Sequence, residues 1–148
     1  MLRRTFLTLA AAGAALAVAG QAVAAEHVVQ MLNRGEGGNM VFVPALVRAR
    51  VGDTIRYVPT NPGHNAETIA GMLPAGVAVT RGAMGREYVL RVTAPGVYGV
   101  KCAPHYCMGR VGLVVVGDGG PNLAAAQAAA GRAPGLARSR FATMFGRL

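Results

Sequence analysis

The residues best suited to chemistry in this chain lie in two short segments. In KCAPHYCMGRVGLVVVGD, residues 101–118, Cys102 is followed three residues later by His105. A second histidine, His64, lies in the Gly- and Pro-containing segment NPGHNAE. One thiolate and two imidazoles are the donor set of an electron-transferring copper site, because sulfur suits Cu(I) and imidazole binds both oxidation states. The pattern therefore indicates one mononuclear copper site built from His64, Cys102 and His105.

The cysteines also allow a metal-free interpretation. Cys102 and Cys107 are the two cysteines of the chain, and an oxidising compartment permits disulfides. Such a bond needs the two Cα atoms to lie about 4.4–6.8 Å apart. Three alternatives therefore stay open from the residues: an electron carrier, a copper carrier or chaperone, and a metal-free sandwich with a Cys102–Cys107 disulfide.

Residues 1–24 have the features of a secretory signal peptide. Arg3 and Arg4 precede an apolar run, and residues 22–24, Ala-Val-Ala, supply a cleavage site. The start RRTFL also fits the twin-arginine pattern, and a Sec signal that carries two arginines is the alternative. The apolar run is shorter than the about 20 residues that a membrane span needs. We expect a periplasmic protein without a membrane anchor, whose mature chain begins at Ala25.

The net charge of the 148-residue chain indicates which kinds of partner it can bind. Its formal net charge is +9, and it falls by two when the leader arginines are removed. A positive surface favours acidic partners. The arginines are scattered singly, without basic runs or interleaved aromatic residues, so the sequence lacks a nucleic-acid-binding signature. The mature length suits one domain with a single core, and we expect a monomer.

Short strand-like segments fill residues 25–118 and are separated by Gly, Pro, Asn and Asp. Pro44 indicates an edge or a bulge within one of them, and His27 is expected to be an ordinary strand residue. This pattern predicts an all-β fold, an antiparallel sandwich or barrel. The expected strands cover residues 27–32, 40–50, 51–59, 86–92, 94–102 and 111–116.

The composition changes in residues 119–148, which are alanine-rich. Pro121 and Pro134 each fit the first turn of a helix, so we expect two short helices, at about 122–130 and 135–146, packed on the sandwich as a C-terminal extension. In the second helix the apolar residues that share a face are Leu136, Phe141, Met144 and Phe145. The arginines expected to face water are Arg132, Arg138, Arg140 and Arg147.

Longer motifs resemble the cupredoxin family of small blue copper proteins. They are VQMLNRGEGGNMVFVPALVRARVGDTIRYVPTNPGHNAETI, TAPGVYGVKCAPHY and VGDGGPNLAA, which together span most of the mature chain. The resemblance implies a Greek-key β-sandwich of eight strands with two C-terminal helices. It also implies one copper per chain and single-electron transfer in the periplasm, without enzymatic chemistry. Implied partners are redox proteins such as copper nitrite reductase or c-type cytochromes, with acidic docking faces.

The same resemblance assigns roles to individual residues. His64 is the upstream imidazole ligand, Cys102 the thiolate, and His105 the exposed imidazole at the edge where electrons enter. Asn65 is implied to connect the two ligand loops and to hydrogen-bond toward the thiolate sulfur, which would orient the ligands.

Two residues depart from the family pattern. The family places an axial methionine eight residues after the cysteine, where this chain has Arg110. A guanidinium only donates hydrogen bonds and cannot ligate copper, so the axial position is unfilled or is taken by another group, such as Met108. A missing thioether and an added positive charge both predict a raised reduction potential. The second departure is Cys107, where the family has a small or apolar residue.

An apolar patch around His105 with a charged rim would suit brief contacts with redox partners. The candidate members of this patch are Pro104, Tyr106, Met108 and Met40, with Met72 and Met84 as neighbours unless they fill the core. The candidate basic rim consists of Arg34, Lys101 and Arg110. Association with acidic partners should then slow at high salt.

Overall fold

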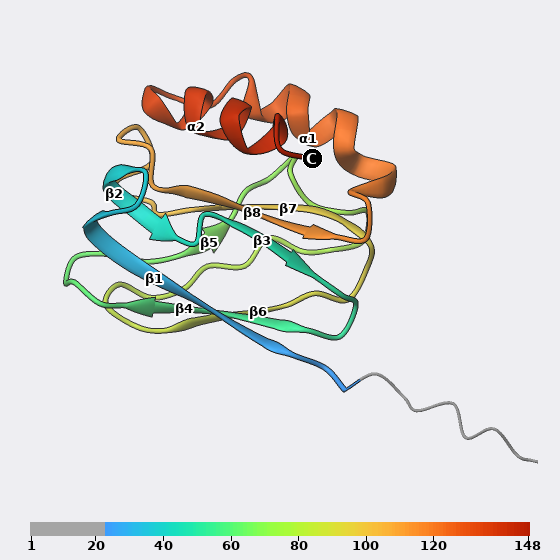
Figure 1. The fold of residues 1–148 in the computed structure, drawn as a ribbon, viewed down its shortest axis with the longest axis horizontal. Helices are drawn as coiled ribbons and strands as arrows, with labels where there is room; N and C mark the ends of the chain where they lie inside the picture. Colours follow the sequence, from blue (N-terminus) through green and yellow to red (C-terminus); the bar gives the residue numbers. More distant parts are fainter. Residues whose placement is uncertain (1–22) are drawn as a thin grey trace, which may run out of the picture.

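The computed structural model describes residues 23–148, so nearly all of the leader predicted over residues 1–24 lies outside the described residues. Within this range eight strands precede a 3-10 turn, η1, and two helices, as Figure 1 shows. The strands are β1 (Glu26–Gly35), β2 (Gly38–Val43), β3 (Leu46–Ala49), β4 (Thr54–Pro59), β5 (Glu67–Thr68), β6 (Tyr88–Arg91), β7 (Gly96–Lys101) and β8 (Val111–Val116). They are followed by η1 (Gly120–Asn122), α1 (Leu123–Ala130) and α2 (Leu136–Phe145).

The strands form two four-stranded sheets, with the orders β2-β1-β4-β6 and β3-β8-β7-β5. This confirms the predicted sandwich with two C-terminal helices. The expected antiparallel arrangement holds for four of the six strand pairs in residues 23–148, whereas β1 pairs with β4 and β3 pairs with β8 in parallel. The single strand expected over residues 40–50 is divided at Pro44, where the chain passes from one sheet to the other. The two-residue strand β5 was not expected, since it is too short to show a period.

The core between the sheets follows the period-two alternation of the strands. In β4, Ile55 and Tyr57 are buried while their neighbours are partly exposed. In β6, Tyr88 and Leu90 are buried and the residues between and after them are exposed. Because successive side chains of a strand point to opposite faces, one face of each strand fills this core.

The strand β8 differs, because all six of its residues are buried. Val114 and Val116 belong to the core between the sheets, whereas Val111 and Leu113 belong to a second core under the helices. A strand covered on both faces has a continuous apolar sequence rather than an alternating one. The second core therefore explains the run VGLVVV.

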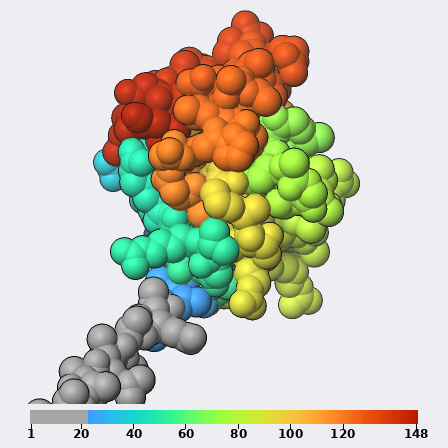
Figure 2. Space-filling model, turned by 90° about the vertical axis from the view of Figure 1, so that its right-hand side faces the viewer, coloured from blue at the N-terminus to red at the C-terminus, as the bar shows by residue number. Residues whose placement is uncertain are grey.

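The helices α1 and α2 cover the outer face of the β7–β8 sheet, as Figures 1 and 2 show. In α2 the buried residues are Ala137, Phe141 and Met144, spaced four and three residues apart on one face. The predicted face was wrong at Leu136, which is 56% exposed. No helix among residues 23–148 is long and apolar enough to cross a bilayer.

Candidate metal centre

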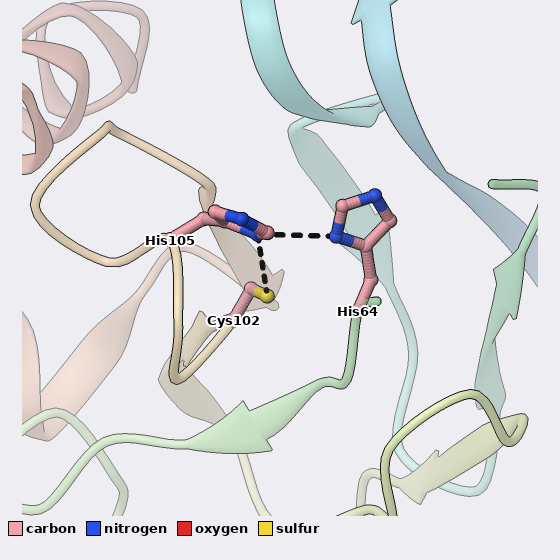
Figure 3. Close-up of side chains that lie close together, drawn as sticks. All are labelled: His64, Cys102 and His105. Carbon is pink, nitrogen blue, oxygen red and sulfur yellow. Dashed lines mark hydrogen bonds between the residues drawn. The ribbon is translucent and has the colours of Figure 1, made fainter. Parts of the chain in front are cut away.

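His64, Cys102 and His105 lie together at one end of the sandwich, and Figure 3 shows their side chains pointing toward one another. His64 comes from the segment between β4 and β5, Cys102 directly follows β7, and His105 lies in the loop between β7 and β8. The Nδ1 atoms of the two histidines are 3.1 Å apart, and Cys102 Sγ is 3.6 Å from His105 Nδ1. All three donor atoms lie within 4.8 Å of one another.

This donor set fits a single transition-metal ion. A tetrahedral ion bonded to nitrogen at about 2.0–2.1 Å and to sulfur at about 2.3 Å separates two nitrogens by about 3.3 Å and a nitrogen from sulfur by about 3.5 Å. The distances in the cluster, 3.1 Å and 3.6 Å, are close to these values. Two imidazoles and one thiolate are the donors of blue-copper electron-transfer sites.

Backbone hydrogen bonds within the loop that carries Cys102 and His105 hold this loop together. Cys102 N–H donates to the carbonyl of Arg110 at 3.0 Å, and Arg110 N–H donates to the carbonyl of His105 at 3.2 Å. Gly109, with a φ of +92°, donates to the carbonyl of Tyr106 at 3.0 Å. These bonds form a compact turn, which fixes the spacing between the thiol and the imidazole.

His64 is oriented by a residue that the sequence prediction missed. Its Nε2 lies 2.6 Å from Oδ1 of Asn33 in β1, so Nε2 carries the proton and donates. The Nδ1 lone pair is then directed at the cluster, as metal-binding histidines require. The carbonyl of His64, in turn, accepts a hydrogen bond from Gly85 N–H at 2.8 Å. No local pattern marks Asn33, because 31 residues separate it from His64.

Asn65 connects the two ligand loops, as predicted. Its Oδ1 accepts a hydrogen bond of 2.8 Å from the N–H of Ala103, the residue after Cys102. The side-chain amide of Asn65 does not make the predicted hydrogen bond to the sulfur. The Asn65 amide nitrogen donates instead to the Glu67 carboxylate at 3.2 Å and to the Gly82 carbonyl at 3.1 Å.

Arg110 lies inside the cluster and not on the surface rim where the sequence prediction placed it. Its side chain is fully buried. Nη1 contacts Nδ1 of His64, lies 3.3 Å from Nδ1 of His105, and lies 4.0 Å from Sγ of Cys102. Nη2 donates to the carbonyl of Leu32 and lies 3.6 Å from Met40 Sδ. The guanidinium of the residue that stands where the family pattern has a methionine thus lies beside all three donor atoms.

This buried cation has an incomplete set of partners. Among residues 23–148 no carboxylate forms an ion pair with Arg110, and its Nε has no hydrogen-bond partner. Burial lowers the pKa of Arg110 from its ordinary value. Burial and then the Arg110 charge also lower the pKa of both histidines, that of His64 to about 4 with a further contribution from His105. Both imidazoles are therefore neutral near pH 7, the state that binds metals.

The two remaining candidates near the sulfur lie at the surface. Met108 is 43% exposed, whereas Arg110 Nη1 lies 4.0 Å from Cys102 Sγ, so the structure gives no support to Met108 as a copper ligand. Cys107 is exposed and Cys102 is buried, and both are free thiols. The structure therefore contains no Cys102–Cys107 disulfide, which removes the support for the metal-free alternative.

The start of α2 is attached to the ligand loop. Leu136 N–H donates to the carbonyl of Cys107 at 2.9 Å, and a Cβ on Gly135 would lie 2.3 Å from the same oxygen. The Arg140 guanidinium donates to the carbonyls of Gly109 and Met40, at 2.8 and 2.9 Å. The expectation that Arg140 faces water was therefore wrong. α2 ties the ligand loop to the β1–β2 hairpin.

The predicted surface patch is only partly present at the surface. Met72 is fully buried and fills the core under the helices. Met84 is 53% exposed, next to Gly85, which donates to the carbonyl of His64. The other predicted members are exposed or half-buried: Pro104, Tyr106, Met108 and Met40.

The predicted basic rim is also only partly present at the surface. Arg34 is exposed, as expected. Lys101 is half-buried, pairs with the Glu67 carboxylate at 3.5 Å, and lies 4.8 Å above the ring of Tyr106. With Arg110 inside the protein, Arg34 and Lys101 are the two members of the predicted rim that reach solvent.

The sequence matches one protein-family model, copper binding proteins of the plastocyanin/azurin family, over residues 29–117. It is 53% identical over 132 residues to a pseudoazurin of Paracoccus pantotrophus, covering 89% of this chain and 90% of the relative.

Solved structures show the same relationship. The crystal structure of pseudoazurin from Methylobacterium extorquens AM1 superimposes with a TM-score of 0.78 at 49% identity, covering 82% of this chain and 98% of that one. Native pseudoazurin from Hyphomicrobium denitrificans gives a TM-score of 0.75 at 40% identity, covering 83% of this chain and 98% of that one.

Proposed function

Because this chain belongs to the plastocyanin/azurin family of copper-binding proteins, and within it to the pseudoazurins, we propose that it carries electrons through a copper ion held by His64, Cys102 and His105. The protein is a blue copper electron carrier with one type I copper and is not an enzyme. The observation that carries the ligand assignment is the convergence of three donor atoms from two loops within 4.8 Å.

Each residue has a distinct part in this role. When bound, the copper supplies the one-electron couple between Cu(II) and Cu(I). The Cys102 thiolate and the His64 imidazole are buried and held by backbone and Asn33 hydrogen bonds, so their positions stay fixed when the charge changes. His105 is only partly buried. Its ring is the part of the donor set that reaches the protein surface, where electrons would enter and leave.

We place this activity in the periplasm. Residues 1–24 have the composition of an export signal, and cleavage after Ala24 would release a mature chain from Ala25. Residues 25–118 would then form the sandwich and residues 119–148 the helical extension packed on it. The mature protein would act as a monomer without a membrane anchor.

The protein exchanges electrons with redox proteins, and we propose copper nitrite reductase or c-type cytochromes with acidic docking faces as these partners. Exposed Met84, Met108 and Pro104 offer an apolar surface near the ligand loops. Arg34 and Lys101 offer positive charge that would attract acidic proteins over a Debye length of about 8 Å at physiological salt.

An absorption spectrum of the purified mature chain with one equivalent of Cu(II) tests the function. A blue or green colour from thiolate-to-copper charge transfer is expected, and it should disappear and return through repeated cycles of reduction and oxidation. A colourless protein, or one without bound copper after gel filtration, would contradict the proposal.

Arg110 favours a second candidate, a copper carrier that passes the metal on. A site with a guanidinium in place of an axial ligand would release copper more readily than one with four protein ligands. Redox cycling in the presence of a copper chelator separates the two functions. An electron carrier keeps its copper through many cycles, whereas a copper carrier loses it to the chelator in the first few.

A further inference from the structure

The Arg110 guanidinium uses the same atom of His64 that a metal would use. Asn33 Oδ1 accepts a hydrogen bond from the protonated Nε2 of His64, which leaves the lone pair on Nδ1. Arg110 Nη1 contacts this Nδ1. One lone pair cannot accept a hydrogen bond from a guanidinium and bind a metal ion at the same time. The present position of Nη1 and metal binding by His64 therefore exclude each other.

Arg110 is also positioned to repel a metal electrostatically. Its Nη1 lies within 4.0 Å of the donor atoms of His105 and Cys102. In the described residues no carboxylate pairs with this cation. Coulomb repulsion between a fixed positive charge and an ion is proportional to the charge of the ion. A divalent ion is thus repelled twice as strongly as Cu(I).

The guanidinium has partners that remain when it leaves His64. Nη2 donates to the Leu32 carbonyl and lies 3.6 Å from Met40 Sδ, both on the β1–β2 side of the cluster. A small rotation that keeps these contacts would release Nδ1. Nε has no hydrogen-bond partner among the described residues, so no bond at that nitrogen has to break for the rotation.

We propose that Arg110 is an internal competitor for the metal: its guanidinium holds His64 Nδ1 until an ion displaces it, and its charge selects Cu(I) over divalent ions. This inference rests on the ligand assignment proposed above. It gives Arg110 a role in loading and metal selection, which is separate from electron transfer. Metal binding is then an exchange of one cation for another.

The first test uses the wild-type protein and needs no variant. Crystal structures are determined of the metal-free protein and of the protein loaded anaerobically with Cu(I). We expect Nη1 to contact His64 Nδ1 in the first structure and to have left it in the second. A guanidinium that is away from His64 without metal, or that has the same position in both structures, would overturn the proposal.

The second test compares affinities for Cu(I) and Zn(II), each measured by competition with a chromophoric chelator. Arg110→Leu should tighten the binding of both ions, because the competitor for His64 Nδ1 is gone, and should tighten Zn(II) binding by about tenfold more than Cu(I) binding, because only the repulsion doubles with the charge. Arg110→Lys keeps the charge and should keep the wild-type ratio of the two affinities. Arg132→Leu removes an exposed arginine and is the matched control, for which both affinities should be unchanged.

The outcomes distinguish this proposal from the proposed function. Equal gains for both ions in Arg110→Leu, or no gain, overturn metal selection even when the wild type forms a coloured copper complex. A wild type and a Leu variant that bind neither ion overturn the ligand assignment together with the competition. Circular dichroism of the metal-free variants verifies folding, and Arg110→Gln, which is neutral and polar, replaces the Leu variant if that variant fails to fold.

Discussion

Two buried polar clusters lie beyond the opposite ends of β4, and they are built in contrasting ways. Before β4, the Asp53 carboxylate accepts hydrogen bonds from Ala25 N–H at 2.8 Å, from Arg50 N–H at 2.9 Å and from His27 Nε2 at 2.9 Å. These bonds, that of Arg50 first, lower the pKa of Asp53 to about 2. His27, expected to be an ordinary strand residue, is thus a partner of this carboxylate. Every group in this cluster has a partner of opposite polarity.

In the ligand cluster beyond the other end of β4, by contrast, some polar groups lack a partner of opposite polarity. Two imidazole nitrogens lie 3.1 Å apart, and a buried guanidinium has no carboxylate among the described residues and one nitrogen without a partner. Buried polar groups in proteins are nearly always satisfied, and the exceptions concentrate at functional sites. The difference indicates that the Asp53 cluster stabilises the fold. The ligand cluster instead lowers the stability of the metal-free fold, and its groups are arranged to bind a metal.

The largest effect should come from removing the sulfur of the ligand cluster. Cys102→Ser is expected to abolish the intense visible absorption of the Cu(II) protein, because a hydroxyl does not supply the thiolate charge transfer. Circular dichroism should show an intact fold. Cys107→Ser is the matched control, since Cys107 is exposed. Its copper spectrum should be that of the wild type, and a band that survives in Cys102→Ser would show that another group binds the copper.

Thermal unfolding of the metal-free protein compares the two clusters directly, and we expect the next largest effect there. Asp53→Ala should lower the melting temperature, because it removes the buried carboxylate that accepts hydrogen bonds from the Ala25 and Arg50 N–H groups and from His27. Arg110→Leu should be neutral or raise stability by up to about 4 kcal/mol, because it removes a buried charge that lacks an ion-pair partner. Two variants that destabilise to the same extent would show that both clusters are structural.

A smaller effect concerns the reduction potential. Arg110→Met removes a positive charge and offers a thioether, and both changes stabilise Cu(II) relative to Cu(I). We expect the potential to fall by on the order of 100 mV, given the repulsion between charges about 4 Å apart and 59 mV per tenfold change in a one-electron couple. Cyclic voltammetry measures it. An unchanged or higher potential would mean that Arg110 does not act on the copper.

The smallest effect is the pH dependence of the Asp53 cluster. Its pKa is about 2 in the folded protein and 3.8 in the unfolded reference. A lowered pKa stabilises the fold above the unfolded value, and this stabilisation is lost as the pH falls through the folded value. The melting temperature of the metal-free protein should therefore fall between about pH 4 and pH 2. Asp53→Asn should show a flatter profile in this window, and equal slopes would assign the loss to other carboxylates.

The sequence was sufficient for the features that depend on local spacing. The strands expected over residues 51–59 and 86–92 contain β4 and β6, and the short Cys102–His105 spacing placed two donors in one loop. His64 was found because it lies in a Gly- and Pro-containing segment and completes the donor set. These predictions succeed because strand period and loop length act over a few residues.

The features that the sequence did not reveal depend on contacts between distant segments. Arg110 was recognised as unable to ligate copper but was placed on the surface, since an arginine is rarely fully buried. Its burial depends on Leu32 and Met40, which are 78 and 70 residues away. Asn33 was missed for the same reason. The face of α2 was misplaced at Leu136 because the period alone does not show which small residue, here Ala137, packs against the sheet.

The attachment of α2 to the ligand loop limits how far this site can be moved to another protein. A designer who transplants residues 102–110 into a shorter sandwich without the terminal helices would keep the donors but lose the bonds from Leu136 and Arg140 to that loop. The grafted loop would then sample more conformations, and electron exchange would slow as its reorganisation energy grows. A faithful graft has to include the helical pair, with Gly135 retained at the point of contact.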